Sequence, residues 1–391
     1  MINVTKLLTG MKGEGDHLRY SIKAGDRPHG VSAGNGPVVV WNTTRACNLS
    51  CRHCYADACL SKESGELTTE EAMSFIDDLA EFKVPVLLLS GGEPLMRPDI
   101  IEIIAYAAAK GLRPVLSTNG TLITVNKARK LLEAGVKYAG ISIDGLGARH
   151  DYFRGMTGSF ERAVKGIRNC QSVGLKVGLR FTISRYTYDD LDEILELIER
   201  ENITRACFYH LVYSGRGSIL QQEDISREQA RQAVDKIIAK TLDLHDKGKH
   251  VELLTVDNHA DGVYLYQWMK ERDPERAALM LELLQRNGGN RSGLAIGCVD
   301  WQGRVYPDQF TRNIEIGSVR QRKFSDIWKE ADHPIMAGLR DRRLLLQGRC
   351  RQCSWLDICN GNFRARASFA SGDFWASDPS CYLSDAEIGI Q

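Results

Sequence analysis

The stretch PVVVWNTTRACNLSCRHC, residues 37–54, joins an apolar segment to three closely spaced cysteines. Its first five residues are continuous and mostly β-branched, which is typical of a strand buried in a sheet. Cys47, Cys51 and Cys54 follow with the spacing C-x3-C-x2-C. At the cysteine content of this chain, that spacing arises by chance in roughly one sequence in a hundred. The stretch therefore predicts a strand that leads into a metal-binding loop.

Strand-like and helix-like segments alternate after this stretch. Apolar strand patterns recur at residues 85–90, 114–117, 138–143, 176–183 and 205–212. Helical patterns begin at a capping box formed by Thr68 and Glu71 and recur at residues 99–110, 126–134, 159–172, 189–200 and 227–247. Such alternation predicts an α/β fold with a parallel sheet and right-handed crossovers. A doubly wound sheet has the same signature, but the positions of the polar motifs favour a partial (β/α)6 barrel.

Polar motifs lie at or just past the ends of the second, third and fourth strands, counted from the strand at residues 37–41. They are Gly91-Gly92-Glu93, Ser117 with Asn119, and Ser142 with Asp144. In a parallel barrel these loops and the cysteine loop converge on one face, where ligands bind. Thiolates are the ligands of iron–sulfur clusters, and three of them leave one iron of a four-iron cluster open. The glycine pair alone would fit a tight turn, but beside three thiols it predicts close approach to a ligand, with Glu93 available to pair an ammonium group.

Composition narrows the classes of function. The chain has 391 residues, with 51 Lys and Arg against 50 Asp and Glu. This balance argues against a dedicated nucleic-acid binder, and the apolar runs are too short to span a bilayer. We find no secretory signal, so we expect a cytoplasmic protein whose eleven cysteines stay reduced. Metal binding is then a better interpretation of the cysteines than a disulfide framework.

The motifs ACNLSCRHCY, LSGGEP and STNG resemble those of the radical S-adenosylmethionine (radical SAM) enzymes. The resemblance implies a [4Fe–4S] cluster on Cys47, Cys51 and Cys54, whose open iron is chelated by the amino and carboxylate groups of S-adenosylmethionine. It also implies a set of cosubstrate-binding residues: Gly91, Gly92 and Glu93 at the amino group, Ser117 and Asn119 near the ribose or carboxylate, His53 against the adenine, and Ser142 and Asp144 close by. The stretch HDYFRG, residues 150–155, resembles the segment whose arginine pairs the methionine carboxylate, which suggests Arg154. The alternative for Arg154 is a solvated residue at a helix start.

A second cysteine group lies near the C-terminus and resembles the SPASM extension of radical SAM enzymes that act on peptides and other large substrates. The resemblance implies a second [4Fe–4S] cluster on Cys350, Cys353, Cys359 and Cys381. A full extension carries seven cysteines and two auxiliary clusters, but Phe363 and Asp308 occupy two of those positions here, and Cys298 alone remains of the other site. We therefore expect one auxiliary cluster. A zinc ion on the four cysteines, or a ligand role for Cys298 and Asp308, are the alternatives.

These assignments divide the chain into four parts. We expect an N-terminal segment at residues 1–36, a radical SAM partial barrel at 37–250, a helical linker at 251–296 and a SPASM-like auxiliary cluster domain at 297–391. The remaining cysteines, Cys59, Cys170 and Cys207, are predicted to be small core residues.

Segments 207–218, 254–266 and 297–310 and the tail DPSCYLSDAEIG resemble a SPASM subgroup that acts on siroheme-derived tetrapyrroles. Its members either remove two acetates from 12,18-didecarboxysiroheme to give Fe-coproporphyrin III for heme, or replace propionates by oxo groups on the same compound for heme d1. Overall similarity favours deacetylation, with the oxo-forming reaction second. A peptide-modifying radical SAM enzyme, a two-cluster electron carrier and a zinc-stabilised binding module are the rival hypotheses.

An iron tetrapyrrole with several carboxylates needs apolar walls and cationic clamps. The sequence offers Phe208, Tyr209 and Tyr213 as wall, Arg216 as a clamp, and Arg180 and Arg185 at the mouth of the fifth strand. His210 and His259 are candidate catalytic residues, as acid/base groups or ligands of the substrate iron, unless they are ordinary hydrogen-bonded residues. Seven arginines between residues 340 and 366 predict a basic surface, either a docking site for a flavodoxin or ferredoxin electron donor or a solvated face.

Overall fold

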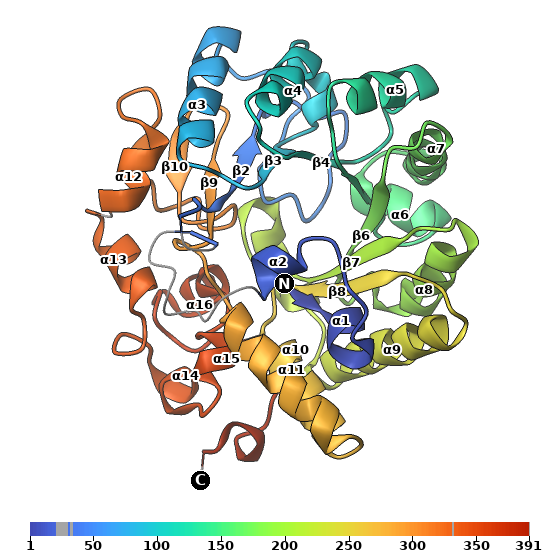
Figure 1. Ribbon diagram of the computed structural model, residues 1–391, viewed down its shortest axis with the longest axis vertical. Coiled ribbons are helices and arrows are strands. Elements are labelled where there is room, and N and C mark those ends of the chain that lie inside the picture. Colours follow the sequence, from blue (N-terminus) through green and yellow to red (C-terminus); the bar gives the residue numbers. More distant parts are fainter. Residues whose placement is uncertain (21–29, 32–33, 331, 391) are drawn as a thin grey trace.

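A computed structural model describes residues 1–20, 30–31, 34–330 and 332–390. In this part of the chain, one sheet has the strand order β1-β8-β7-β6-β5-β4-β3-β2-β9-β10-β11. Its central members run parallel: β2 (Val38–Asn42), β3 (Leu87–Ser90), β4 (Pro114–Thr118), β5 (Ala139–Ser142), β6 (Val177–Ile183), β7 (Arg205–His210) and β8 (Glu252–Val256). Figure 1 shows these strands in an arc with helices outside it. The six strands β2–β7 lie within two residues of their predicted bounds, which confirms the partial barrel.

The outer layer consists of the predicted helices. They are α3 (Thr69–Glu81), α4 (Ile100–Ala109), α5 (Val125–Glu133), α7 (Ser159–Ser172), α8 (Leu191–Arg200) and α9 (Arg227–Asp246). The capping box of α3 forms as predicted, because the Thr68 hydroxyl accepts from the Glu71 amide and the Glu71 carboxylate accepts from the Thr68 amide. A further helix, α6 (Gly147–Arg154), follows β5.

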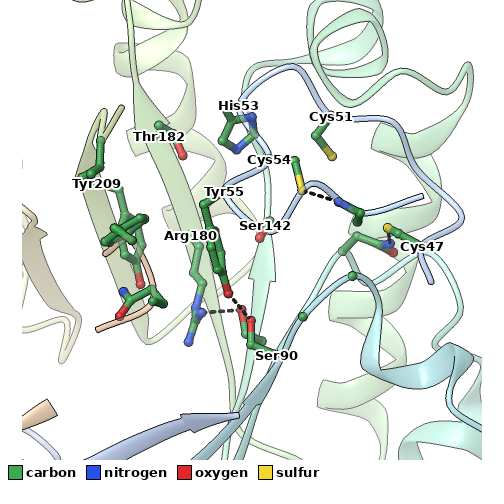
Figure 2. A pocket seen from close by; sticks show the side chains of 18 of the residues that line it. Cys47, Cys51, His53, Cys54, Tyr55, Ser90, Ser142, Arg180, Thr182 and Tyr209 are labelled. Carbon is green, nitrogen blue, oxygen red and sulfur yellow. Dashed lines mark hydrogen bonds between the residues drawn. The ribbon is translucent and has the colours of Figure 1, made fainter. Parts of the chain in front are cut away.

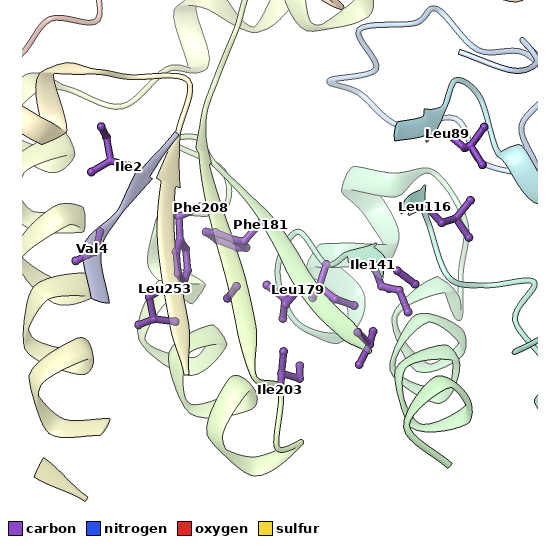
Figure 3. Packing of buried hydrophobic residues seen from close by; sticks show 14 of the residues in the cluster. Ile2, Val4, Leu89, Leu116, Ile141, Leu179, Phe181, Ile203, Phe208 and Leu253 are labelled. Carbon is purple, nitrogen blue, oxygen red and sulfur yellow. The ribbon is translucent and has the colours of Figure 1, made fainter. Parts of the chain in front are cut away.

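Side chains alternate across each barrel strand and so separate the core from the interior. On β6, Leu179 and Phe181 are fully buried against the helices, and Figure 3 shows them beside Phe208 of β7. Arg180 and Thr182 point to the other face and line the cavity described below. Phe208 belongs to the helix-facing core, so its predicted role as a substrate wall is wrong.

The sheet continues on both sides of the six predicted strands. On one side, β8 pairs parallel with β7, and β1 (Ile2–Asn3) pairs antiparallel with β8. On the other side, β9 (Ile296–Val299) pairs parallel with β2. The segment expected to be a helical linker therefore starts with a barrel strand, followed by α10 (Ala260–Lys270) and α11 (Pro274–Asn287).

The remaining elements are short. They are α1 (Val4–Thr9), α2 (Asp16–Arg19), β10 (Arg304–Tyr306), β11 (Gly317–Ser318), α12 (Phe324–Glu330), α13 (Pro334–Arg340), α14 (Gly348–Gln352), α15 (Leu356–Cys359) and α16 (Arg364–Ser371). Helices α12–α16 lie together on one side of the sheet in Figure 1. Among the described residues, no helix has the length and apolar character needed to cross a membrane.

Candidate active site

A cavity of about 1170 Å³, its open mouth included, lies at the carboxyl ends of the parallel strands. It is lined by fourteen of the predicted site residues: Cys47, Cys51, His53, Cys54, Gly91, Gly92, Ser117, Asn119, Ser142, Arg154, Arg180, Tyr209, His210 and Arg216. Glu93, Asp144 and His259 do not line it. The loops expected to converge therefore do so around one cavity (Figure 2).

The three thiols of the first cysteine group receive hydrogen bonds from different donors. The Leu49 amide lies 3.4 Å from Cys47 Sγ, the Ala58 amide 3.4 Å from Cys54 Sγ, and Arg154 Nη1 3.6 Å from Cys51 Sγ. Burial raises the pKa of the Cys47 thiol to about 12. Such a thiol is neutral near pH 7 unless a cation binds it, and donors directed at all three sulfurs suit metal-bound thiolates. The donor set therefore fits an iron–sulfur cluster.

Two glycines allow the second loop to dock on the cysteine loop. The Gly92 amide donates to the Thr44 carbonyl at 2.8 Å. A Cβ atom on Gly92 would lie 2.2 Å from the Ala46 carbonyl oxygen, and one on Gly91, where φ is +128°, would lie 2.5 Å from the Thr44 oxygen. Any side chain would separate the loops, so the glycine pair serves this close approach.

Glu93 connects loops instead of facing the cavity. Its buried carboxylate accepts hydrogen bonds from Thr118 Oγ1 at 2.8 Å, the Asn119 amide at 2.8 Å and the Leu95 amide at 3.1 Å. Burial raises the pKa of Glu93, although these hydrogen bonds oppose the shift. The structure therefore places Glu93 as a positioning residue for Asn119, and it leaves the cavity side of this loop to the backbone of the glycines.

Asp144 organises the residues expected around the cosubstrate. This buried carboxylate pairs with the Arg154 guanidinium and lies 3.2 Å from His53 Nε2. Burial opposes its ionisation, but the Arg154 guanidinium lowers the pKa of Asp144 below its usual value. Burial lowers the pKa of His53 to about 4, so its ring, stacked on Phe153 at 4.6 Å, is neutral. Arg154 ends α6 and is 8% exposed, so the solvated helix-start alternative is wrong.

Arg216 holds the cysteine loop. Its Nε donates to the Cys51 carbonyl at 3.0 Å and its Nη1 to the Ala58 carbonyl at 2.7 Å. Its backbone amide donates to the Cys54 carbonyl at 3.0 Å. Its Nε and Nη1 are therefore used within the protein, whereas its buried Nη2 has no hydrogen-bond partner among the described residues.

Arg216→Ala is expected to lower the iron content at the first cysteine group and the yield of 5′-deoxyadenosine, with tetrapyrrole affinity retained. Hydrogen bonds from a charged donor contribute about 1.5–3 kcal/mol each, and the variant removes two. Anaerobic iron analysis and tetrapyrrole titration measure both effects. Full iron content with weakened tetrapyrrole binding would instead restore the clamp hypothesis. Arg129→Ala, an exposed change on α5, is the control.

The wall away from the cysteines carries Arg180 and Tyr209, which Figure 2 shows on the opposite side from Cys47. Arg180 Nη1 donates to Ser117 Oγ at 2.5 Å, and among the described residues no carboxylate pairs with its guanidinium. Gly140 makes room for it, since a Cβ there would lie 2.2 Å from Arg180 Nε. A lone arginine in an apolar strand was the sequence signal. Asp257, which also lines the cavity, was not anticipated.

The other expected substrate residues are divided between the cavity and the protein interior. His210 lines the cavity, and its Nε2 lies 3.0 Å from Asp261 Oδ2. His259 is buried on Phe363, with ring centroids 6.2 Å apart, and the amide of His259 is bonded to Asn362. Tyr213 and Arg185 also lie outside the cavity lining, and Arg185 is exposed.

The second cysteine group surrounds a smaller, separate cavity. Its lining includes Cys350, Cys353, Cys359 and Cys381. The Trp355 amide lies 3.4 Å from Cys353 Sγ, and burial raises the pKa of Cys359 and Cys381. Four convergent, half-buried thiols fit a fully ligated cluster.

Cys298 and Asp308, the two residues considered as ligands of a second auxiliary site, contact other groups in the protein. Cys298 packs between Val40 and Tyr306, and the Asp308 carboxylate accepts from Thr311 and the Phe310 amide in a turn. Cys170 and Cys207 are buried as expected, whereas Cys59 is half-buried.

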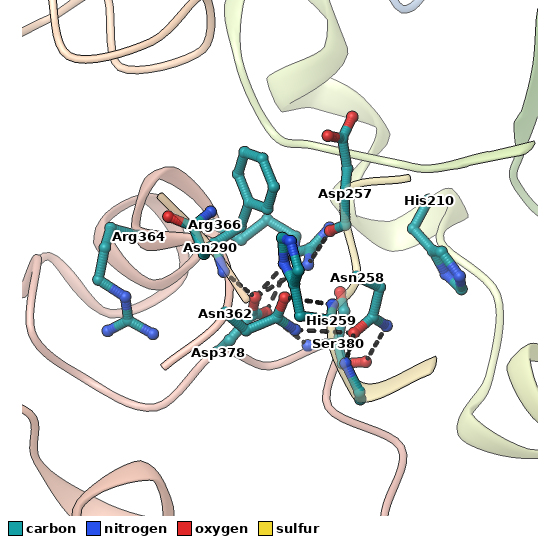
Figure 4. A network of polar contacts seen from close by, with 12 residues as sticks. His210, Asp257, Asn258, His259, Asn290, Asn362, Arg364, Arg366, Asp378 and Ser380 are labelled. Carbon is teal, nitrogen blue, oxygen red and sulfur yellow. Dashed lines mark hydrogen bonds and ion pairs between the residues drawn. The ribbon is translucent and has the colours of Figure 1, made fainter. Parts of the chain in front are cut away.

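Arg366 joins the C-terminal region to the barrel (Figure 4). It forms a fully buried ion pair with Asp378, at 2.9 Å. Its Nη1 donates to the Leu211 carbonyl at 3.0 Å and its Nη2 to the Asp257 carbonyl at 2.6 Å. Because Cys381 follows Asp378 by three residues, this ion pair ties the second cysteine group to the ends of β7 and β8.

The predicted basic surface is wrong in part. Arg342, Arg364 and Arg366 are at most 2% exposed and donate to carbonyl groups or to Asp378. Arg343 and Arg349 pair with Asp357 and Asp385. From the sequence alone, buried arginines whose guanidinium groups donate to backbone carbonyls cannot be distinguished from arginines on a charged surface.

Comparison with known proteins identifies the family of this chain. The family model described as the radical SAM superfamily matches residues 41–198. The chain is 52% identical to Fe-coproporphyrin III synthase of Methanosarcina barkeri, covering 100% of this chain and 99% of that protein. It is 43% identical to pre-heme d1 synthase of Dinoroseobacter shibae, over 90% and 88% of the two chains.

Solved structures share the fold. Streptococcus suis SuiB bound to its precursor peptide superposes with a TM-score of 0.71 at 17% identity, over 90% of this chain and 76% of that chain. Native anSMEcpe with bound AdoMet superposes with a TM-score of 0.67 at 16% identity, over 88% and 93%. The protein is thus an enzyme that uses S-adenosylmethionine and a [4Fe–4S] cluster. It belongs to the radical SAM superfamily, in the subgroup that contains the Fe-coproporphyrin III and pre-heme d1 synthases and works in heme biosynthesis.

Proposed function

We propose that this enzyme removes the two acetate side chains of 12,18-didecarboxysiroheme and produces Fe-coproporphyrin III. The observation that carries the proposal is the 52% identity to Fe-coproporphyrin III synthase over the whole chain. The 43% identity to pre-heme d1 synthase supports exchange of propionates for oxo groups as the second candidate.

The cosubstrate site is proposed to be the half of the cavity that contains Cys47, Cys51 and Cys54. When bound there, the cluster and S-adenosylmethionine supply one-electron chemistry that removes a hydrogen atom from the substrate. The chain's own residues bind and orient the cosubstrate. The glycine backbone would receive the amino group, Arg154 the carboxylate, and the neutral ring of His53 the adenine. Asn119 and Ser142 line the same half.

Arg180 is proposed to receive a carboxylate of the tetrapyrrole. Burial would disfavour its charge, yet the tyrosines and Cys207 around it help to keep its pKa high, so it remains a cation. An arginine fork beside Ser117 and without a carboxylate partner in the described structure matches an incoming carboxylate. His210 and Tyr209 line the same cavity.

Arg180→Ala is therefore expected to weaken tetrapyrrole binding about ten- to a hundredfold, because charge-assisted bonds contribute about 1.5–3 kcal/mol. S-adenosylmethionine binding should change less than twofold. Anaerobic titration of each ligand into the variant measures both affinities, with Arg129→Ala as the control. Equal losses for both ligands would contradict a substrate-specific role.

The second cysteine group is proposed to hold an auxiliary [4Fe–4S] cluster. Its four ligands would leave no iron open, which suits electron transfer. A flavodoxin or ferredoxin is proposed as the electron donor. Iron, acid-labile sulfide and zinc analysis of anaerobically purified protein tests the cluster: about eight irons per chain and no zinc are expected.

Mass spectrometry of products tests the proposed reaction. The protein is incubated anaerobically with S-adenosylmethionine, reductant and 12,18-didecarboxysiroheme. Fe-coproporphyrin III and free acetate are expected. A product that keeps its acetates and gains oxo groups would establish the second candidate, and an unchanged tetrapyrrole would overturn both.

A further inference from the structure

We propose that Asp257 supplies the proton that the departing acetate carbon takes up when its bond to the macrocycle breaks. This inference rests on the proposed deacetylation. Asp257 directly follows β8 and lines the same cavity as Cys47, Cys51 and Cys54. It is separate from the cosubstrate residues and from the Arg180 clamp.

The backbone at Asp257 is strained in a way that directs the side chain. Its φ is +67°, a left-handed conformation that costs of order 1–3 kcal/mol for a residue with a side chain. Arg366 Nη2 donates to its carbonyl at 2.6 Å, and the neighbouring Asn258 side chain donates to the Ser380 carbonyl at 2.9 Å. These bonds hold the strained turn, and Figure 4 shows the Asp257 carboxylate pointing away from this network.

The carboxyl group is buried and available. Asp257 is 5% exposed, and among the described residues its carboxylate forms no ion pair and no hydrogen bond. The neighbouring buried carboxylates differ, since Asp261 is bonded to His210 and Tyr382, and Asp378 to Arg366. The Asp257 carboxyl is therefore a buried polar group in the cavity wall without a hydrogen-bond partner in the described structure, and such a group is suited to contact a ligand.

The surroundings of the Asp257 carboxyl allow it to keep its proton near neutral pH. Burial raises the pKa of Asp257 to about 7, against the opposing effects of Arg366, the Met1 amino group and His210, and with a further increase from Asp308. An exposed aspartate, with a pKa of about 3.9, would be ionised. Burial raises the pKa of the phenols of Tyr55 and Tyr209, which also line the cavity, so they are weaker acids.

The reaction requires one such proton for each side chain removed. A hydrogen atom leaves a ring carbon next to the one that bears the acetate, and it is taken up in 5′-deoxyadenosine. The bond from the ring to the CH2 group then breaks homolytically, so the macrocycle gains a double bond and a CH2–COO⁻ radical departs. One electron from a low-potential iron–sulfur donor and one proton from Asp257 convert this fragment to CH3–COO⁻. Solvent water returns the proton to Asp257 through the open mouth.

Asp257→Asn tests the assignment. Asparagine tolerates a positive φ and keeps the shape of the side chain, so folding should be preserved. Acetate release is expected to fall at least about tenfold, because a positioned acid contributes about 10²–10⁴-fold. Uncoupled formation of 5′-deoxyadenosine and tetrapyrrole affinity should stay within about twofold. Asp257→Glu should restore a substantial part of acetate release, and Asp78→Asn, a buried carboxyl on α3 outside the cavity, is the matched control.

Isotope labelling in ²H₂O gives a second readout. The wild-type enzyme should release acetate that carries one solvent deuterium, and its rate of acetate release should be lower in ²H₂O than in ordinary water. In the Asp257→Asn variant, the rate of acetate release should no longer depend on the solvent isotope. Release at the wild-type rate, or parallel losses of acetate, 5′-deoxyadenosine and tetrapyrrole binding, would overturn the role of Asp257. Failure of the proposed function looks different, since the wild-type protein itself would then release no acetate.

Discussion

Replacing Cys47, Cys51 and Cys54 together by alanine is expected to abolish 5′-deoxyadenosine formation and to remove about four irons per chain. The physical reason is that these thiols converge on the cavity at the carboxyl ends of the strands, where their sulfurs would chelate the cluster. Burial raises the pKa of Cys47 to about 12, so without a bound metal its thiol carries no charge near neutral pH. Iron and sulfide analysis with chromatographic detection of 5′-deoxyadenosine measures the outcome.

The matched control replaces Cys350, Cys353, Cys359 and Cys381. That variant should also lose about four irons, but it should keep the first cluster, because the two cysteine groups line different cavities. S-adenosylmethionine cleavage that persists in the first variant would contradict the cosubstrate site. Zinc released by the second variant would show that this site is a zinc site.

Arg366→Ala is expected to lower the free energy of unfolding by about 3–5 kcal/mol. Both members of the Arg366–Asp378 pair are 0% exposed, so the substitution leaves Asp378 charged and buried without its partner. The carbonyls of Leu211 and Asp257 lose their donors as well. Because Asp378 leads to Cys381, the iron content of the second cysteine group should fall with stability. Chemical denaturation of the anaerobic protein and iron analysis measure the two effects.

Arg343→Ala provides the comparison. Arg343 also pairs with an aspartate, Asp357, but both side chains are more than half exposed. Solvent screens such a pair, and its loss should cost at most about 1 kcal/mol. Similar losses for both variants would mean that the buried pair is not a structural hub.

Local sequence patterns were sufficient to predict the strands and helices of the partial barrel. Six strands and five helices lie within two residues of their predicted bounds, and α3 begins at its predicted cap, because a continuous apolar run or an amphipathic period is set by neighbouring residues. The short strands β8 and β9 were not found this way, since their positions depend on pairing with β7 and β2.

Many residues that line the cavity were predictable because motif and strand end coincide. Roles were harder to predict than positions. Glu93 and Arg216 were expected to contact ligands, yet their groups are bonded to Asn119 and to the cysteine loop. Phe208 and Arg180 lie on neighbouring strands, and only the pleat decides that the first faces the helices and the second faces the cavity.

By itself, the sequence determined the order of strands and helices, the two cysteine groups and the family, since these depend on spacing along the chain. Tertiary structure alone decided which charged groups are buried together. Among the arginines of residues 340–366, some have buried guanidinium groups bonded to interior partners and others form ion pairs at the surface. Arg366 also holds the strained turn that directs the Asp257 side chain toward the cavity. The physical reason is that burial and charge pairing depend on residues from distant parts of the chain, which no local pattern records.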